Sequence, residues 1–143
     1  MEGYSLLYNK LFEALDSMPF VNIVTEGLSD EIDLSKQTIF PLAHIVINTA
    51  TPIDNAVTFN VTIYAMDIVD ISDDGRNNKV DVMNTQYNVL LRLYEQLRRG
   101  NLWSDKIEVE TFSMIAFEQA YENFFDGWQS NMKLVIPNHM TIC

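Results

Sequence analysis

The sequence predicts an α+β domain with a single small sheet, antiparallel or mixed, that has a long hairpin and is covered by an N-terminal helix and one long helix. Residues 57–65 alternate apolar and polar side chains, as expected for a strand with one buried face. Residues 80–99 repeat apolar side chains at the spacing of an amphipathic helix. The 143 residues, 48% of them hydrophobic, fit one domain, residues 1–143, with a packed core.

The start of the chain predicts a helix followed by a short strand. Apolar residues recur three and four positions apart over residues 3–18, and Pro19 ends this helix. Residues 20–25 are rich in β-branched and aromatic types, which favour a strand, and residues 26–31 are turn-like and acidic. We therefore expect this part of the chain to supply one helix that covers the sheet and one strand that pairs within it.

A long hairpin is predicted next. Residues 37–48 indicate a strand, with Pro41 near its start at an edge or bulge, because proline has no backbone donor for a neighbouring strand. Residues 49–54 include Pro52 and predict a linker to the strand at residues 57–65, so that the two strands pair in antiparallel fashion. The apolar face of the second strand carries Val57, Phe59, Val61, Ile63 and Ala65, and its polar face carries Thr58, Asn60, Thr62 and Tyr64.

The second half of the chain predicts the long helix and the closing strands. Gly100 ends the helix, which at 1.5 Å per residue is ~30 Å long and is the expected main cover of the sheet. Residues 107–112 alternate as a strand, and residues 113–120 either extend it after a bulge or begin another strand. Residues 121–127 predict a turn or a single helical turn. The last strand spans residues 128–136.

The charge of the chain argues against nucleic-acid binding. Lys and Arg number 9 and Asp and Glu number 20, giving a formal net charge of -11 that repels phosphate backbones and anionic membranes. Arg92, Arg98 and Arg99 cluster on the long predicted helix, and we interpret them as a solvated face near its C-terminus. Neither a signal peptide nor an apolar run of ~20 residues is visible, which predicts a protein inside a cell and outside the membrane.

A polar loop before the long helix is the best candidate for a metal site. Asp70, Ser72 and Asp74 match ligand positions of a calcium-binding EF-hand loop, and Asp81 falls at the twelfth position. An EF-hand ends in a glutamate and is entered from a helix, whereas here the last residue is Asp and the preceding element is a strand. We favour the alternative that these residues cap the following helix, and we expect no bound metal or cofactor.

Catalytic groups are sparse. His44 falls inside a predicted strand, His139 falls in the tail, and the single cysteine, Cys143, is the last residue. A reactive cysteine needs an ordered electropositive site, which a chain terminus rarely offers. The sequence contains no glycine-rich phosphate loop and no nucleophile elbow. We therefore expect a protein that is not an enzyme.

A segment near the C-terminus resembles a known protein family. Residues 121–134 read YENFFDGWQSNMKL and resemble the ending of tail-terminator and head-to-tail joining proteins of tailed bacteriophages. In that group an N-x-x-x-G-W turn, here Asn123, Gly127 and Trp128, leads into a final amphipathic strand. The predicted order of elements over residues 3–136 is also similar to that family, and residues 137–143 are similar to the tails of Bacteroidetes phage and prophage proteins.

The resemblance implies a structural virion protein without enzymatic activity. Such a protein is the subunit of a ring, six-fold in tails or twelve-fold near the portal, that caps the tail tube or joins it to the head. Its neighbours are neck, portal or tail-tube proteins, and DNA passes through its lumen without specific binding. The ring is assembled in the host cytoplasm and becomes part of the virion neck or tail, with no contact to a membrane.

For this role the sequence suggests contact residues in four places. They are Thr58, Asn60, Thr62 and Tyr64 on the polar strand face, Pro52 and Asp54 near the hairpin turn, Asp73 in the acidic loop, and Trp128. Trp128 fits an interface anchor and a core residue equally well. The alternative function is a cytoplasmic acidic adaptor or inhibitor that binds a basic partner, as charge complementarity allows.

Overall fold

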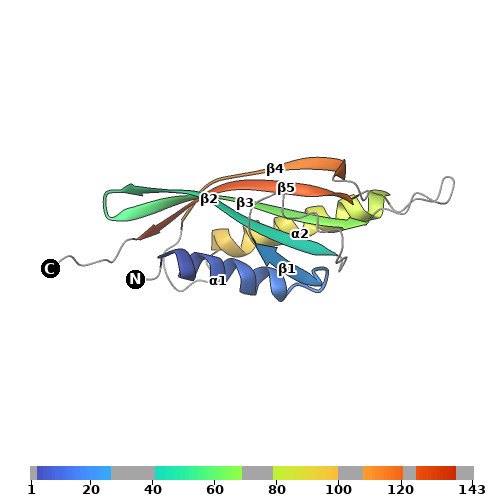
Figure 1. Cartoon of the computed structure of the whole chain (residues 1–143), viewed down its shortest axis with the longest axis horizontal. Coiled ribbons are helices and arrows are strands. Elements are labelled where there is room, and N and C mark those ends of the chain that lie inside the picture. Colours follow the sequence, from blue (N-terminus) through green and yellow to red (C-terminus); the bar gives the residue numbers. More distant parts are fainter. Residues whose placement is uncertain (1–2, 27–40, 69–78, 100–107, 121–124, 138–143) are drawn as a thin grey trace.

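A computed structural model describes residues 3–26, 41–68, 79–99, 108–120 and 125–137 of the chain. In these ranges a five-stranded mixed sheet is packed against two helices, which confirms the predicted α+β fold (Figure 1). In chain order the elements are α1 (Gly3–Asp16), β1 (Ile23–Glu26), β2 (Leu42–Ile53), β3 (Ala56–Ile68), α2 (Lys79–Arg99), β4 (Glu108–Ala120) and β5 (Phe125–Pro137).

The central strand of the sheet is β3, the segment with the clearest alternation in the sequence. The strand order is β1-β2-β3-β5-β4, with β1 parallel to β2 and all other neighbours antiparallel. Along its whole length β3 pairs with β5, from Ala56 opposite Pro137 to Ile68 opposite Phe125. The two edges of the sheet therefore belong to β1, which is short, and to β4, which has 13 residues.

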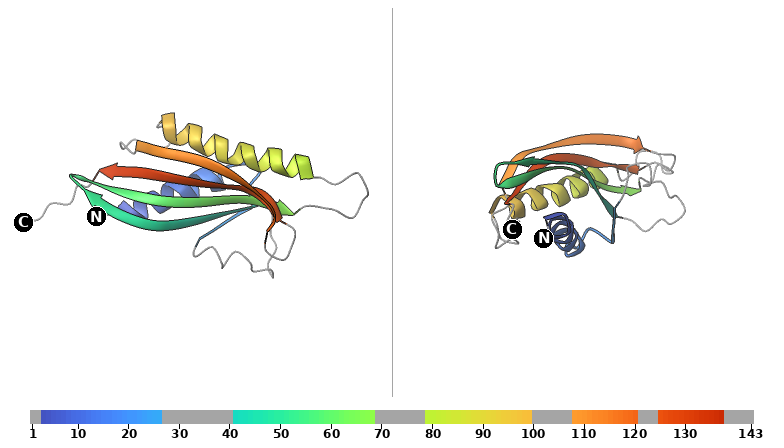
Figure 2. Two further views of the ribbon diagram at one scale, coloured as in Figure 1. Left: turned by 90° about the horizontal axis from the view of Figure 1, so that it is seen from above. Right: turned by 60° about the vertical axis from the view of Figure 1, so that its left-hand side comes forward.

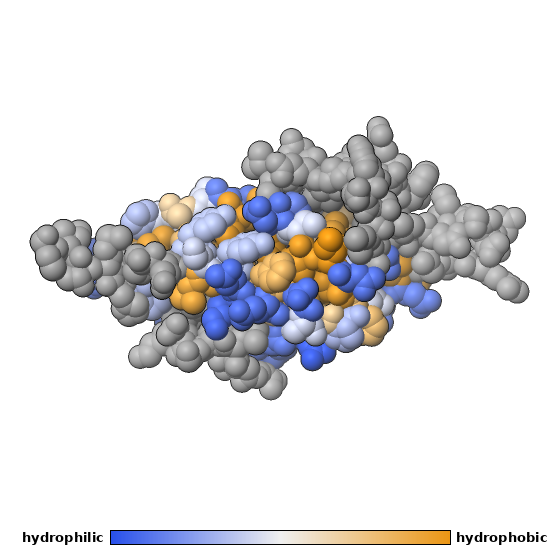
Figure 3. All heavy atoms as spheres, turned by 60° about the horizontal axis from the view of Figure 1, so that its bottom comes forward, coloured by the Kyte–Doolittle hydropathy of each residue, from blue (hydrophilic) through white to orange (hydrophobic). Residues whose placement is uncertain are grey.

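Both helices cover the same face of the sheet (Figure 2). The long helix α2 packs against β3, β4 and β5, whereas α1 lies against β1 and β2. With 21 residues, α2 is ~30 Å long and is the main cover, as the sequence predicts. On the side where α1 lies, hydrophobic side chains show between hydrophilic ones, and Tyr4 and Phe20 are among the exposed aromatics (Figure 3).

The core lies between the helices and this inner face of the sheet. It confirms the predicted apolar face of β3, because Phe59, Val61, Ile63 and Ala65 are all buried there. The helices contribute Leu7, Leu11 and Leu15 from α1 and Val89, Leu90, Leu93 and Leu97 from α2, and β5 contributes Met132, Leu134 and Ile136. Burial of these apolar side chains is the main source of stability of the fold.

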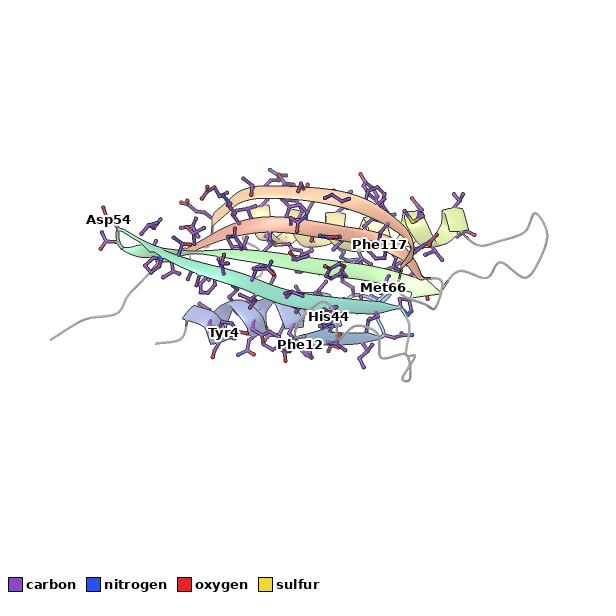
Figure 4. All side chains as sticks on the ribbon, turned by 45° about the horizontal axis from the view of Figure 1, so that its top comes forward. Tyr4, Phe12, His44, Asp54, Met66 and Phe117 are labelled. Carbon is purple, nitrogen blue, oxygen red and sulfur yellow. The ribbon has the colours of Figure 1, made fainter. Side chains whose placement is uncertain are left out.

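We call the other face of the sheet, which carries no helix, the outer face. One end of it holds a small second apolar cluster, in which Leu42 and Met66 are buried and Ile23, Tyr64 and Phe117 pack against them. Figure 4 shows Met66, Phe117 and His44 together at this end, far from Asp54 at the opposite end.

The hairpin differs from the sequence prediction in the length of its strands. Residues 49–54, expected to be a linker, continue β2 as far as Ile53, and only Asp54 and Asn55 form the turn. In this extension Thr51 pairs with Thr58 and Ile53 pairs with Ala56. Asn55 has a φ of 61°, which lets the chain reverse at the turn. Residues flanking a two-residue turn hydrogen-bond to each other, so the nitrogen of Pro52 points away from β3, where no donor is needed.

The C-terminal strands also differ from the sequence prediction. Residues 113–120 extend β4, with shifts of register between Val109 and Thr111 and between Phe117 and Ala120, which resolves the alternative that the sequence left open. Strand β5 already begins at Phe125, so Gly127 lies inside a strand and not in the expected turn. The reason is close packing, since an added Cβ at Gly127 would lie 2.0 Å from the carbonyl oxygen of Ala65.

Candidate interaction surface

The end of the β2–β3 hairpin projects beyond both helices (Figure 1). We call residues 49–58 the hairpin arm. From Thr49 to Asn55 every side chain of the arm is exposed, and half of the surface of Ile53 (51%) is accessible to solvent. Asp54 lies at the tip (Figure 4). The tip of the arm thus presents one apolar and one negatively charged side chain to the solvent.

At the base of the arm, polar side chains join three strands across the outer face. The amide nitrogen Nδ2 of Asn48 donates to Oγ1 of Thr62 over 2.9 Å, and this hydroxyl donates to Oδ1 of Asn131 over 3.0 Å. Thr62, expected on a solvent face, is only 7% exposed because it lies in the middle of this chain of hydrogen bonds. Its role is therefore to fix the positions of the two asparagines.

A hollow of about 280 Å³ lies over these side chains. It is lined by Asn48, Asn60, Val61, Thr62, Thr111, Ser113, Asn131, Met132 and Lys133. Its volume is just below the range of pockets for drug-sized ligands, roughly 300–1,000 Å³. Amide and hydroxyl groups with one ammonium group give it many hydrogen-bond donors and acceptors and a positive charge. We call this site the polar hollow.

Lys133 gives the polar hollow its charge. It lies opposite Asn60 of β3 and Thr111 of β4, and it is exposed. Glu108 lies on the same face, opposite Val135, yet in the described part of the chain no ion pair joins a carboxylate to Lys133. An exposed ammonium group of this kind is free to meet a carboxylate of another molecule.

The apolar end of the outer face holds His44 in a structural role. This histidine is 1% exposed, its Nδ1 lies 2.6 Å from Oγ1 of Thr25, and its ring packs 6.3 Å from the ring of Tyr64. Tyr64 in turn contacts the ring of Phe117 at 6.2 Å. His44 is thus a buried and partnered sheet residue, and Tyr64 is half-buried between two rings.

Trp128 lies on the inner face, under the sheet. Its Nε1 donates to the backbone carbonyl of Met83 in α2 over 3.0 Å, and its ring packs 5.5 Å from that of Tyr87. The sequence left core and interface roles equally open for this residue. The structure assigns it to the contact between α2 and β5.

Several predicted site residues lie outside the described residues, namely Asp70, Ser72, Asp73 and Asp74. Asp81 is exposed in the first turn of α2. In the ranges that the structure describes, no group of three or more His, Cys, Asp or Glu side chains is arranged to hold a metal ion. Neither of the two described helices is long and apolar enough to cross a membrane.

The predicted contact residues thus differ in their exposure to solvent. Pro52 and Asp54 lie exposed on the arm, Thr58 and Asn60 are half-buried on the outer face, and Thr62 is buried. Lys133 and Asn131 were missed by the sequence reasoning. The alternation of residues 128–136 could have indicated them, because it places both on the polar side of the last strand.

The sequence matches no protein-family model and no curated protein.

Proposed function

We propose that this chain is a structural subunit of a ring in the neck or tail of a tailed bacteriophage, where it is a tail terminator or a head-to-tail connector. The observation that carries the proposal is the presence of two unlike exposed surfaces on one chain, the hairpin arm and the outer face with its polar hollow. A ring requires such a pair, since each subunit presents one surface to the subunit before it and another to the subunit after it.

The order of elements supports the proposal. The resemblance near the C-terminus implies an N-terminal helix, a strand, a long hairpin, one long helix and closing strands, and the elements follow in that order. Gly127 and Trp128, which carry the resemblance, lie inside β5 and not in the turn that the resemblance implies. Gly127 lets β5 approach β3, and Trp128 bonds to α2. Both residues thus belong to the framework that positions the arm.

The strand edges supply further contact surface. The edge of β4 is 13 residues long, and at its beginning Glu108 and Glu110 are exposed. Charged side chains on an edge oppose uncontrolled pairing between strands, whereas a specific partner can still cover the edge. In the proposed ring, neighbouring neck, portal or tail-tube proteins meet such edges.

The net charge of -11 fits a ring that encloses a DNA passage. A negative lumen repels the phosphate backbone, so DNA moves through without being held. This part of the proposal predicts that Arg92, Arg98 and Arg99 lie away from the lumen. A ring structure in which these three arginines line the passage would contradict it.

The test is the mass of the purified chain by light scattering over a concentration series, with negative-stain microscopy of any large species. We expect closed rings of six or twelve subunits. A chain that remains monomeric at every concentration and instead captures a basic protein would overturn the ring and favour an acidic adaptor or inhibitor.

A further inference from the structure

We infer that the tip of the hairpin arm docks on the polar hollow of a second copy of this chain, with Asp54 of one subunit facing Lys133 of the next. The inference rests on the proposed ring function and names the contact that closes the ring. Arm and hollow are different surfaces of one chain, so the contact is heterologous and can be repeated around an axis.

One pair of opposite charges marks where the two surfaces meet. Asp54 is an exposed carboxylate at the tip of the arm, and Lys133 is an exposed ammonium group at the polar hollow. Within one chain they cannot meet, because Lys133 lies opposite Asn60, five residues from Asn55 at the turn, or ~16 Å along an extended strand. The pair can form only between two molecules.

The polar hollow can also satisfy the backbone of an incoming arm. In the hydrogen bonds between the described side chains, Asn48 uses only its Nδ2 and Asn131 only its Oδ1. Oδ1 of Asn48 and Nδ2 of Asn131 are therefore available as an acceptor and a donor on either side of Thr62. The arm offers matching groups, because the outer edge of β2 beyond Ile45 has no neighbour among the described strands.

Ile53 supplies an apolar contact next to the charge pair. It is 51% exposed on the arm, and Ile115 is 53% exposed on the outer face of β4. Ile115 lies two residues from Ser113, which lines the polar hollow, so both side chains project on the same face of β4. A docked arm can cover both isoleucines, which removes apolar surface of each subunit from water.

The experiment uses charge reversal on the full chain, with association followed by sedimentation velocity over a concentration series. Asp54→Lys places two lysines in contact, and Lys133→Glu places two carboxylates in contact. We expect each variant alone to need a concentration at least ~10-fold higher than the wild type for half-association, because like charges in an interface strongly oppose binding. An equimolar mixture of the two variants restores association, since every contact between unlike copies is again complementary.

Two matched variants control for net charge. Asp16→Lys and Arg92→Glu make the same changes of charge on exposed positions of α1 and α2, on the helix side of the sheet. We expect both to associate within about two-fold of the wild type, because they lie outside the contact. Thermal unfolding of all four variants shows whether the monomer fold is kept, as expected for exposed positions.

The outcomes separate this contact from the ring itself. Closed wild-type rings that persist equally in both reversal variants would reject the contact and leave the proposed function standing. If mixing the two variants restores association but the products are open chains of subunits and not rings, the contact is supported and the ring is rejected. Failure of the mixture to associate better than its components, or a wild-type chain that stays monomeric throughout, overturns the inference.

Discussion

Gln86 is the residue that fits its surroundings least well. It lies on the buried side of α2, between Val82 and Leu90 on the same helical face, and it is fully buried. In the part of the chain that the structure describes, neither Nε2 nor Oε1 has a hydrogen-bond partner. A buried amide without partners costs free energy that an apolar side chain of the same shape would not.

We therefore predict that Gln86→Met stabilises the protein by about 1–3 kcal/mol in the free energy of unfolding. Methionine keeps the length and flexibility of the side chain and removes the two polar atoms. Urea denaturation of the wild type and the variant measures the difference. A loss of stability on this substitution would show that the amide is hydrogen-bonded in solution, for example to a buried water molecule.

Tyr8 gives the fold a dependence on alkaline pH. Burial raises the pKa of its hydroxyl above the ordinary value of 10.0, and the carboxylate of Glu26 raises it further. The folded state thus holds this proton more tightly than the unfolded chain. The resulting stability is present below pH ~10 and is lost as the pH rises through the pKa of the folded state.

The expected result is that Tyr8→Phe loses less stability than the wild type as the pH rises above ~10. Tyr87→Phe is the control, because Tyr87 is an exposed tyrosine of the other helix and does not contribute to the raised pKa of Tyr8. Denaturant unfolding at several pH values gives the slope of the free energy of unfolding against pH for the wild type and for each variant. Equal slopes for Tyr8→Phe and the wild type would contradict the assignment to Tyr8.

At the scale of elements, the spacing between β3 and β5 depends on Gly127. A Cβ at this position would lie 2.0 Å from the carbonyl oxygen of Ala65 and 2.8 Å from the Cα of Met66. Both obstacles are backbone atoms of the central strand, so a side chain cannot be accommodated by rotation of a neighbour. The strands themselves would have to move apart.

We predict that Gly127→Ala lowers the free energy of unfolding by roughly 1–3 kcal/mol or more, which is the usual cost of overpacking. Gly3→Ala makes the same substitution at the start of α1 and serves as the control. Chemical denaturation provides the measurement. Unchanged stability of Gly127→Ala would mean that β5 does not approach β3 this closely in solution.

At the scale of the whole molecule, the charges of the subunits oppose their own assembly. Each copy carries a formal net charge of -11, whereas the inferred contact between Asp54 and Lys133 offers one ion pair for each pair of neighbours. An exposed ion pair contributes only about 0–1 kcal/mol. Repulsion between whole subunits therefore decides the response of assembly to salt.

The prediction is that added NaCl promotes association. Between 0.01 M and 0.1 M salt the Debye length falls from about 30 Å to about 10 Å, which screens repulsion between the bodies of neighbouring subunits. Light scattering at fixed protein concentration should show the average mass rising across this series. A fall in mass with salt would mean that ion pairs across the interface outweigh the net repulsion.

Residue types and their periodicity determined much of the fold. The alternation over residues 57–65 predicted the central strand and its buried face, and the helical spacing over residues 80–99 predicted the main cover. These predictions succeed because a strand or helix with one buried face carries apolar residues at a regular spacing, every second residue in a strand and every third or fourth in a helix. Proline and glycine were poorer guides, since Pro52 lies in a strand and Gly127 lies in a strand.

The candidate surface depended on the tertiary structure. The sequence contains Asn48, Asn131 and Lys133, but only the strand order β2-β3-β5 brings the first two into one chain of hydrogen bonds through Thr62 and places the third beside them. Likewise, alternation could not decide whether Trp128 is a core or an interface residue, because both roles put it on an apolar face. By itself the sequence determined which faces are buried, since burial follows from local periodicity. Which polar residues share a surface was decided only by the pairing of strands far apart in the chain.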